Sequence, residues 1–286
     1  MSTRRRAVTA DAVSLTIRST LIWFLWSPSQ TPAPAPYPHA YDPGVAGAAP
    51  SQADALAALS REIVACRACP RLVEWRERVA REKRAAFRDE DYWGRPLPGF
   101  GDPRAQLLVA GLAPAAHGGN RTGRIFTGDR SGDWLFGALY RTGYANQPTS
   151  VHRDDGLELQ DAYIAAAVRC APPSNKPTPE ERDRCLPFLV RELALLERVR
   201  VIVALGQFAY DAAARVLAAS GSPLPTPRPR FGHGSEAHSA RAVVLGCYHP
   251  SQQNTFTGKL TEEMMDAVFA RARDLAERVA RKPGHP

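Results

Sequence analysis

The chain has 286 residues, a formal net charge of +8 and a pI of about 9.5. Its apolar fraction of 44% allows a sizeable core, in one large domain or two small ones. Five cysteines in so long a chain argue against a disulfide scaffold, and no stretch reaches the roughly 18 apolar residues of a membrane span. The basic charge favours a polyanionic partner, chiefly nucleic acid, although a merely basic soluble protein fits it equally well.

Residues 1–50 differ from the rest, because they hold seven of the 25 prolines. Such a composition favours a disordered extension. A short apolar stretch after Arg4, Arg5 and Arg6 superficially resembles a secretory signal but lacks a small-residue cleavage motif. We therefore expect one folded domain over residues 51–282, in a chain that stays in the cytoplasm.

The remaining chain alternates helical and strand patterns. Apolar spacing predicts a first helix over 54–66, and the basic segment 71–88 is expected to present a solvated helix face. Ser131 is a candidate cap for a helix, and Thr178 begins another with Glu181 at its third position. Candidate strands cover 106–110, 163–168, 199–205 and 241–247, and further helices cover 131–140, 178–198, 207–219 and 260–281. This alternation predicts a parallel sheet covered on both faces.

The first strand leads into GLAPAAHGGNRTGRIFTGD, residues 111–129. This stretch contains five glycines and several polar side chains, and it is too polar and too long to serve only as a connection. In open α/β sheets, ligands bind outside the carboxyl ends of the strands, where such loops lie. The sequence therefore predicts a binding or catalytic site here.

Two further loops, 169–177 and 248–259, follow strand ends and should converge on the first. That convergence would gather Asp129, Asn175 and His249 in one cleft. A carboxylate can activate water, an amide can read the edge of a base, and an imidazole can stabilise a developing anion.

The cysteines suggest a metal centre. Cys66 and Cys69 form a C-x2-C pair, and Cys170 and Cys185 come from distant segments. Four sulfurs fit either tetrahedral zinc or an iron–sulfur cluster, and the 14-residue gap between the last two fits a cluster somewhat better. Cys247 lies in an apolar run and is expected to be a core residue.

Five separated motifs resemble those of family 5 (type b) uracil-DNA glycosylases. They are Cys66-x2-Cys69-Pro-Arg-Leu, PGFGDP at 98–103, the stretch 111–129, VRCAPPSNKPTP and YHPSQQNTFTGKLT. The resemblance covers about residues 63–276. It implies a three-layer α/β/α sandwich around a four-stranded parallel sheet, and a 4Fe-4S cluster on the four cysteines.

The resemblance also implies monofunctional hydrolysis of the N-glycosidic bond of uracil in double-stranded DNA, with hypoxanthine and other deaminated bases as further substrates. Ala113, Phe126 and Asn175 would contact the flipped base, while Asp129, Asn175 and His249 would catalyse. Other families of this fold carry a polar residue early in the first motif, where this chain has Ala113, so the water-activating residue comes from elsewhere. The side chains expected on DNA are Arg121, Arg124, Lys176, Ser251, Gln252, Gln253, Asn254 and Lys259.

Two other interpretations stay open at this point. A non-catalytic, metal-stapled nucleic-acid-binding protein would explain the charge and the cysteines. A nucleotide-binding hydrolase has less support, because the chain lacks both G-x4-G-K-[ST] and G-x-G-x-x-G. We expect a monomer that works at the nucleoid.

Overall fold

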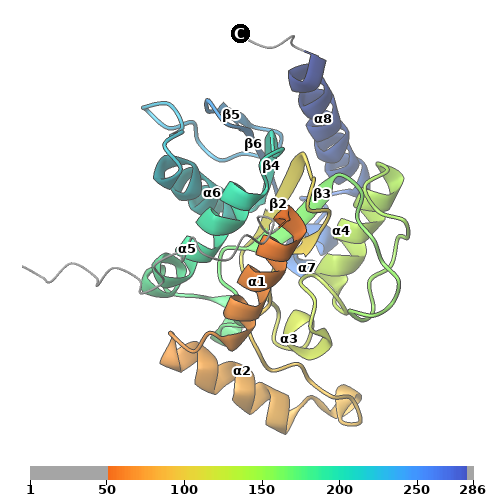
Figure 1. Cartoon of the computed structure of the whole chain (residues 1–286). Coiled ribbons are helices and arrows are strands. Elements are labelled where there is room, and N and C mark those ends of the chain that lie inside the picture. The colour runs from red at the N-terminus through yellow and green to blue at the C-terminus, as the bar shows by residue number, and fades with distance from the viewer. Residues whose placement is uncertain (1–50, 282–286) are drawn as a thin grey trace, which may run out of the picture. The chain divides into compact units, whose positions relative to one another are not determined.

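The structure is a computed structural model that describes residues 51–281 (Figure 1). The extension predicted over residues 1–50 lies outside the described residues. The helices are α1 (Gln52–Ala65), α2 (Pro70–Glu82), α3 (Gly119–Thr122), α4 (Arg130–Arg141), α5 (Pro179–Leu195), α6 (Gln207–Ala219), α7 (Gln252–Phe256) and α8 (Glu262–Arg281). The strands are β1 (Phe100–Gly101), β2 (Leu107–Gly111), β3 (Ala162–Ala166), β4 (Val201–Leu205), β5 (Glu236–His238) and β6 (Val243–Cys247).

One sheet runs through this part of the chain, with strand order β1-β3-β2-β4-β6-β5. The four central strands are parallel and match the four predicted ones, so the predicted parallel core is confirmed. The two edge strands are antiparallel additions that the sequence did not predict. They have only two and three residues, and β1 lies in a segment rich in Pro and Gly, so neither carries a strand pattern.

Helices cover both faces of the sheet and give the expected three layers (Figure 1). Along β2, side chains alternate between the two faces. Leu107 and Val109 pack in the cluster that contains residues of α4 and α8. Leu108 and Ala110 pack in the opposite cluster with residues of α1, α5 and α6. No helix in the described part of the chain combines the length and the apolar character needed to cross a membrane.

Helix starts follow from capping side chains, with one correction. The oxygen of Thr178 accepts from the backbone N–H of Glu181, whose carboxylate reaches back to Thr178, which is the predicted capping box. Helix α4 is capped by Asp129 rather than by Ser131, because the Asp129 carboxylate accepts from the N–H of Gly132. The basic segment is also only partly solvated: α2 ends at Glu82, and Arg76 within it is 2% exposed.

A buried ion pair joins the end of β3 to α5. The side chains of Arg169 and Glu192 are each 1% exposed, and two guanidinium nitrogens donate to the two carboxylate oxygens. Glu192 also accepts from the backbone N–H of Gly99 at 3.1 Å. The carbonyl of Arg169 accepts from the N–H of Leu97 at 2.8 Å. This pair therefore fixes the segment before β1 against the strand that leads to Cys170.

Replacing Glu192 by Gln should destabilise the protein strongly, because it leaves a buried guanidinium without its counter-charge. Breaking a buried pair from one side costs about 3–5 kcal/mol. Urea unfolding measures the change in the free energy of unfolding. Glu62→Gln is the matched control, since Glu62 pairs with Arg191 at 51% exposure on both sides and an exposed pair contributes at most about 1 kcal/mol. Equal losses in the two variants would contradict the assigned role.

Candidate active site

A cavity of about 740 Å³ lies at the carboxyl ends of the central strands. Its walls include Asp129, Asn175 and His249, which come from the loops that follow β2, β3 and β6. Ala113 and Phe126 line the same cavity. The structure therefore brings together the five residues that the sequence assigned to catalysis and base recognition.

Phe126 forms an aromatic wall of this cavity. It is 7% exposed, and its backbone has a φ of 53°. Close approach to glycines makes its position possible: a Cβ on Gly111 would lie 2.8 Å from ring atom Cε2, and one on Gly132 would lie 1.8 Å from the carbonyl oxygen of Phe126. The centroid of its ring lies 6.0 Å from that of His249, with 36° between the planes. Both residues line the cavity.

His249 is held as a neutral imidazole. Burial lowers its pKa to about 4, so the ring carries no charge near neutral pH. The carbonyl of His249 accepts from Nδ2 of Asn254 at 2.9 Å, which fixes the backbone of the loop. Within residues 51–281 no hydrogen bond engages the His249 ring nitrogens. They are therefore free to contact a ligand in the cavity.

Asp129 combines a capping bond with an unusual pKa. Its Oδ1 accepts from the N–H of Gly132 at 3.0 Å, at the positive end of α4. Burial nevertheless raises the pKa of the carboxyl above its usual range, because desolvation outweighs these hydrogen bonds. A Cβ on Gly118 would lie 2.1 Å from Oδ2 of Asp129, so only glycine lets the carboxylate lie against this loop. A carboxylate that binds a proton more tightly than usual is suited to act as a base.

Asn175 reaches the cavity from the loop after β3. It is exposed, and both it and Ser174 have left-handed backbones, with φ of 55° and 53°. Asn tolerates this conformation better than most residues. The turn is closed by bonds from the N–H of Asn175 to Pro172 and from the N–H of Lys176 to Pro173. The amide is thus presented by a single 3-10 turn, Pro173–Asn175.

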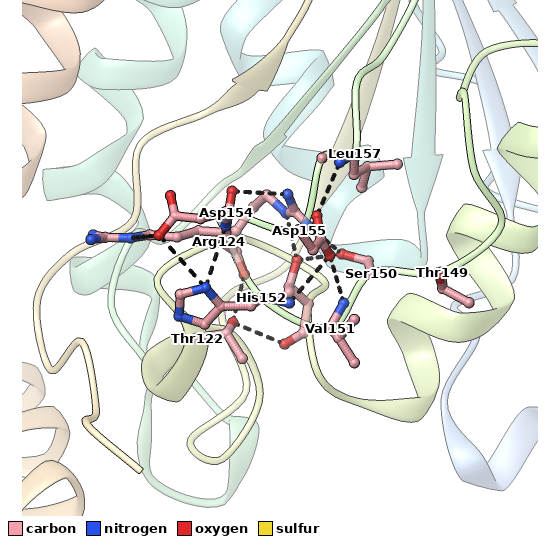
Figure 2. A network of polar contacts seen from close by, with 12 residues as sticks. Thr122, Arg124, Thr149, Ser150, Val151, His152, Asp154, Asp155 and Leu157 are labelled. Atoms are coloured by element: carbon pink, nitrogen blue, oxygen red, sulfur yellow. Dashed lines mark hydrogen bonds and ion pairs between the residues drawn. The ribbon is translucent and has the colours of Figure 1, made fainter.

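Arg124, which was expected on DNA phosphate, lies inside the structure: its side chain is 4% exposed and donates to several protein groups. Figure 2 shows its guanidinium at the centre of a polar network. It donates to the two carboxylate oxygens of Asp155 at 2.7 and 2.8 Å and to Oγ of Ser150 at 2.8 Å. Asp155 also accepts from the N–H of Val151 at 2.8 Å. The network ties the first motif to the segment before β3.

Arg121 was also expected on phosphate and is also internal, at 8% exposure. Its guanidinium pairs with Glu90 and donates to the carbonyls of His117 at 2.8 Å and Gly128 at 2.9 Å. Both acceptors belong to the loop that carries Asp129. Arg121 therefore holds the shape of that loop, and we do not propose it as a DNA contact.

The last motif divides into structural and exposed positions. Oγ of Ser251 accepts from the N–H of Asn254 at 3.4 Å and caps α7, so these two residues shape the turn after His249. Gln252 and Gln253 are exposed and line the cavity. They are therefore the members of this motif that a ligand outside the cavity would meet first.

Comparison with known proteins places this site in a family. The model of the Uracil DNA glycosylase superfamily matches residues 98–273. A type-5 uracil-DNA glycosylase of Mycobacterium tuberculosis is 56% identical over 226 residues, covering 78% of this chain and 83% of that protein. One of Thermus thermophilus is 51% identical over 220 residues, covering 77% and 97%. The chain belongs to the type-5 uracil-DNA glycosylase family.

The four cysteines that the sequence predicts as cluster ligands lie in or next to one buried cluster. Cys69, Cys170 and Cys185 pack in one buried cluster, and Arg76 connects Cys66 to it by donating to the carbonyl of Cys66 and to Sγ of Cys170. Within the described residues, no group of three or more His, Cys, Asp or Glu side chains is arranged to hold a metal ion. Cys247 is buried in the main core, as predicted, and is not part of this group.

Four charged or aromatic side chains that line the cavity of about 740 Å³ had no role predicted from the sequence: Arg84, Phe87, His117 and Arg130. Arg84 and Phe87 follow α2, where Lys83 turns the chain with a φ of 54°. That segment carries only a helical charge pattern, so nothing in it indicated this reversal. Nδ1 of His117 is bonded to the hydroxyl of Tyr92 at 3.0 Å, a pairing across 25 residues that no local motif predicts.

We predict that the ring of His249 titrates with a midpoint near pH 4, because burial disfavours its charged form. Above the ordinary histidine pKa of about 6.5 its folded and unfolded states are both neutral. Between about 6.5 and 4 only the unfolded state binds the proton, so the contribution of His249 to stability falls as pH falls. NMR titration of the ring carbons, assigned with His249→Asn, measures the midpoint. A midpoint above 6 would contradict the buried, neutral ring.

Proposed function

We propose that this protein hydrolyses the N-glycosidic bond of uracil in double-stranded DNA and leaves an abasic site. The observation that carries the proposal is the meeting of Asp129, Asn175 and His249 in one cavity beside the ring of Phe126. The type-5 relatives, named as uracil-DNA glycosylases, support it. Hypoxanthine and other deaminated bases are proposed as further substrates. We propose that the protein acts as a monomer in the cytoplasm, at the nucleoid.

The cavity suits a flipped nucleobase. Its volume of about 740 Å³ lies within the range typical of small-ligand sites. A base inside a duplex is out of reach of such a cavity, so the nucleotide must first rotate out of the stack. The ring of Phe126 would then stack on the base, and the exposed amide of Asn175 would read its polar edge. Gln252 and Gln253, exposed beside the cavity, would fill the gap left in the duplex.

The chemical step separates charge in two directions. The departing base gains negative charge, and the N–H of the neutral His249 imidazole would donate a hydrogen bond to its oxygen. The sugar becomes electron-poor, and Asp129 can stabilise it and accept a proton from the attacking water. The raised pKa of Asp129 favours that proton transfer. Burial fixes the protonation behaviour of both groups before the substrate binds, so little rearrangement is needed during the reaction.

Exposed cations around the cavity are the better phosphate contacts. Arg84 and Arg130 line the cavity and are exposed, unlike Arg121 and Arg124. The guanidinium of Arg130 lies 4.4 Å from the ring centroid of Phe256, whose side chain is 67% exposed. We propose that these two arginines bind the DNA backbone phosphates on either side of the flipped nucleotide. Lys176 and Lys259, both exposed, remain proposed phosphate contacts.

We also propose that Cys66, Cys69, Cys170 and Cys185 hold a 4Fe-4S cluster. Around a single tetrahedral ion with metal–sulfur bonds of about 2.3 Å, the sulfur ligands lie about 3.8 Å from one another. The cysteine sulfurs around a 4Fe-4S cluster lie farther apart. The surroundings fit a thiolate-bound cluster, because buried N–H groups donate hydrogen bonds to the cysteine sulfurs. Arg76 donates to Sγ of Cys170 at 2.8 Å, and the N–H of Arg169 donates to Sγ of Cys185 at 3.4 Å. When bound, the cluster would supply a cross-link between these segments.

The non-catalytic alternative explains less of the site. A binding protein needs cations and can use a metal staple, and both fit this chain. It does not need a half-buried neutral imidazole and a carboxyl of raised pKa in one cavity, which cost stability. Such perturbed groups are typical of catalytic sites.

His249→Ala and Asn175→Ala should each slow single-turnover excision of uracil by roughly 100- to 1000-fold, because a preorganised donor contributes about 2.7–4 kcal/mol to the transition state. The rate is measured at saturating enzyme, with alkali cleavage of the abasic product. His238→Ala is the matched control, since His238 is 63% exposed at the edge strand β5. Parental rates in His249→Ala would show that its proposed donation to the departing base is not part of the reaction.

The Cys170→Ser variant should lose iron, the brown absorbance and thermal stability together. Cys170 is one of the four proposed cluster ligands and directly precedes the loop that carries Asn175. Iron content, the visible spectrum and the melting temperature are measured on the purified protein. Cys247→Ala is the control: it deletes a buried thiol from the main core and should keep its iron. A colourless Cys170→Ser protein with parental melting temperature would overturn the structural role of the cluster.

A further inference from the structure

A second cavity, of about 890 Å³, lies between α1, α2 and the segment of Tyr92 to Arg95. It shares no lining residue with the base cavity. None of the motifs used above assigns it a role. Its size is larger than that of the base cavity, and its walls carry an unusual excess of one charge.

Five arginines and one carboxylate line this second cavity. The carboxylate, Glu77, is already paired, because Arg67 donates to both of its oxygens. Arg61, Arg81 and Arg95 are exposed, and within residues 51–281 none of them forms an ion pair. Three guanidinium groups are thus available for an anionic ligand.

The remaining arginine, Arg76, supplies a buried cation to the wall. It is 2% exposed, and its terminal nitrogens donate to Sγ of Cys170 at 2.8 Å and to the carbonyl of Cys66 at 3.3 Å. Its Nε has no hydrogen-bond partner within the described residues, and the nearest carboxylate oxygen, on Glu77, lies 3.8 Å from its guanidinium. The Cys170 thiolate of the proposed cluster would be the nearest counter-charge of Arg76, whose guanidinium adds one more cation to the lining of the second cavity.

The second cavity also has apolar and aromatic walls. Val64, Ala80 and the ring of Trp93 contribute to its lining. The indole N–H of Trp93 donates to the carbonyl of Pro96 at 3.2 Å, which fixes the ring, and Arg95 lies over it with 5.8 Å to the centroid. Cations beside a fixed aromatic surface match a phosphate group attached to a sugar and a base, rather than a simple anion.

One side chain joins the two cavities. Tyr92 lines the second cavity, and its hydroxyl is hydrogen-bonded at 3.0 Å to Nδ1 of His117, which lines the base cavity. A strand with its flipped nucleotide in the base cavity would therefore have neighbouring nucleotides close to the second one. We propose that the second cavity binds backbone phosphates of the same DNA, outside the flipped nucleotide. This inference rests on the proposed function.

The test compares two triple variants that remove the same charge. Arg61→Ala, Arg81→Ala and Arg95→Ala together delete the exposed cations of the second cavity. Arg104→Ala, Arg198→Ala and Arg278→Ala form the control, since these arginines are exposed and within residues 51–281 form no ion pair. Arg104 and Arg198 precede β2 and β4, at the sheet edge opposite the active site.

Affinity for a long duplex is measured by fluorescence anisotropy at several salt concentrations, once without and once with uracil. Removing one phosphate-binding arginine should lower the slope of log K against log salt by about 0.9, so the slope should fall by up to about 2.7 in the cavity variant and much less in the control. Excision by the cavity variant should slow at limiting enzyme and recover at saturating enzyme. Equal slopes in the two variants would overturn the proposal.

Two further outcomes separate this proposal from the proposed function and from binding of a free nucleotide. If the parent protein fails to excise uracil, the proposed function is wrong, yet the slopes on undamaged duplex still decide whether the second cavity binds DNA. Calorimetry with thymidine monophosphate tests a free nucleotide as the source of the same phosphate chemistry. The assignment to DNA would be overturned by two results together: thymidine monophosphate binds the parent protein but not the cavity variant, and the salt dependence of DNA affinity is the same in the cavity variant as in the control.

Discussion

The buried pair of Arg169 and Glu192 is the constraint on which the other parts of the site depend. The backbone of Arg169 lies between β3 and the cysteine pocket, with its N–H on Sγ of Cys185 and its carbonyl on the N–H of Leu97. Glu192 in turn holds the N–H of Gly99. A cation enclosed in the protein must have its counter-charge, so the pair can form in only one arrangement of these segments. That arrangement sets where the loop with Asn175 leaves the sheet.

Burial sets the chemistry of the cavity as well as its shape. It raises the pKa of Asp129 and lowers that of His249, because in each case it disfavours the charged form. One physical cause thus yields a more basic carboxylate and a neutral hydrogen-bond donor. Glycines make this burial possible, since a Cβ at Gly118 would collide with the carboxylate and one at Gly111 with the ring of Phe126. The glycines of the first motif therefore serve close approach rather than flexibility.

The parallel core and the meeting of Asp129, Asn175 and His249 could be predicted, because the carboxyl ends of parallel strands always lie at one edge of a sheet. The roles of Arg121 and Arg124 could not, because a charged residue in a polar loop looks the same in the sequence whether it faces DNA or Asp155. The reversal at Lys83 that brings Arg84 to the cavity has no local signal either. In each case the sequence does not show which distant residue the side chain contacts in the folded protein. That contact depends on whether the side chain is buried.

Asp129 shows how the fold and the proposed reaction share one side chain. As the cap of α4 it satisfies a backbone N–H that would otherwise be unpaired, and this bond fixes the orientation of the carboxylate. The positive end of the helix favours the ionised form, while burial disfavours it more strongly, and the pKa ends above its usual range. In the proposed reaction, Asp129 would be a base fixed by a helix end, with its proton affinity raised by its surroundings, and water activation would need no polar residue at Ala113. Under this proposal, the cap accounts for alanine at position 113, where the resemblance implies a polar side chain in other families of this fold.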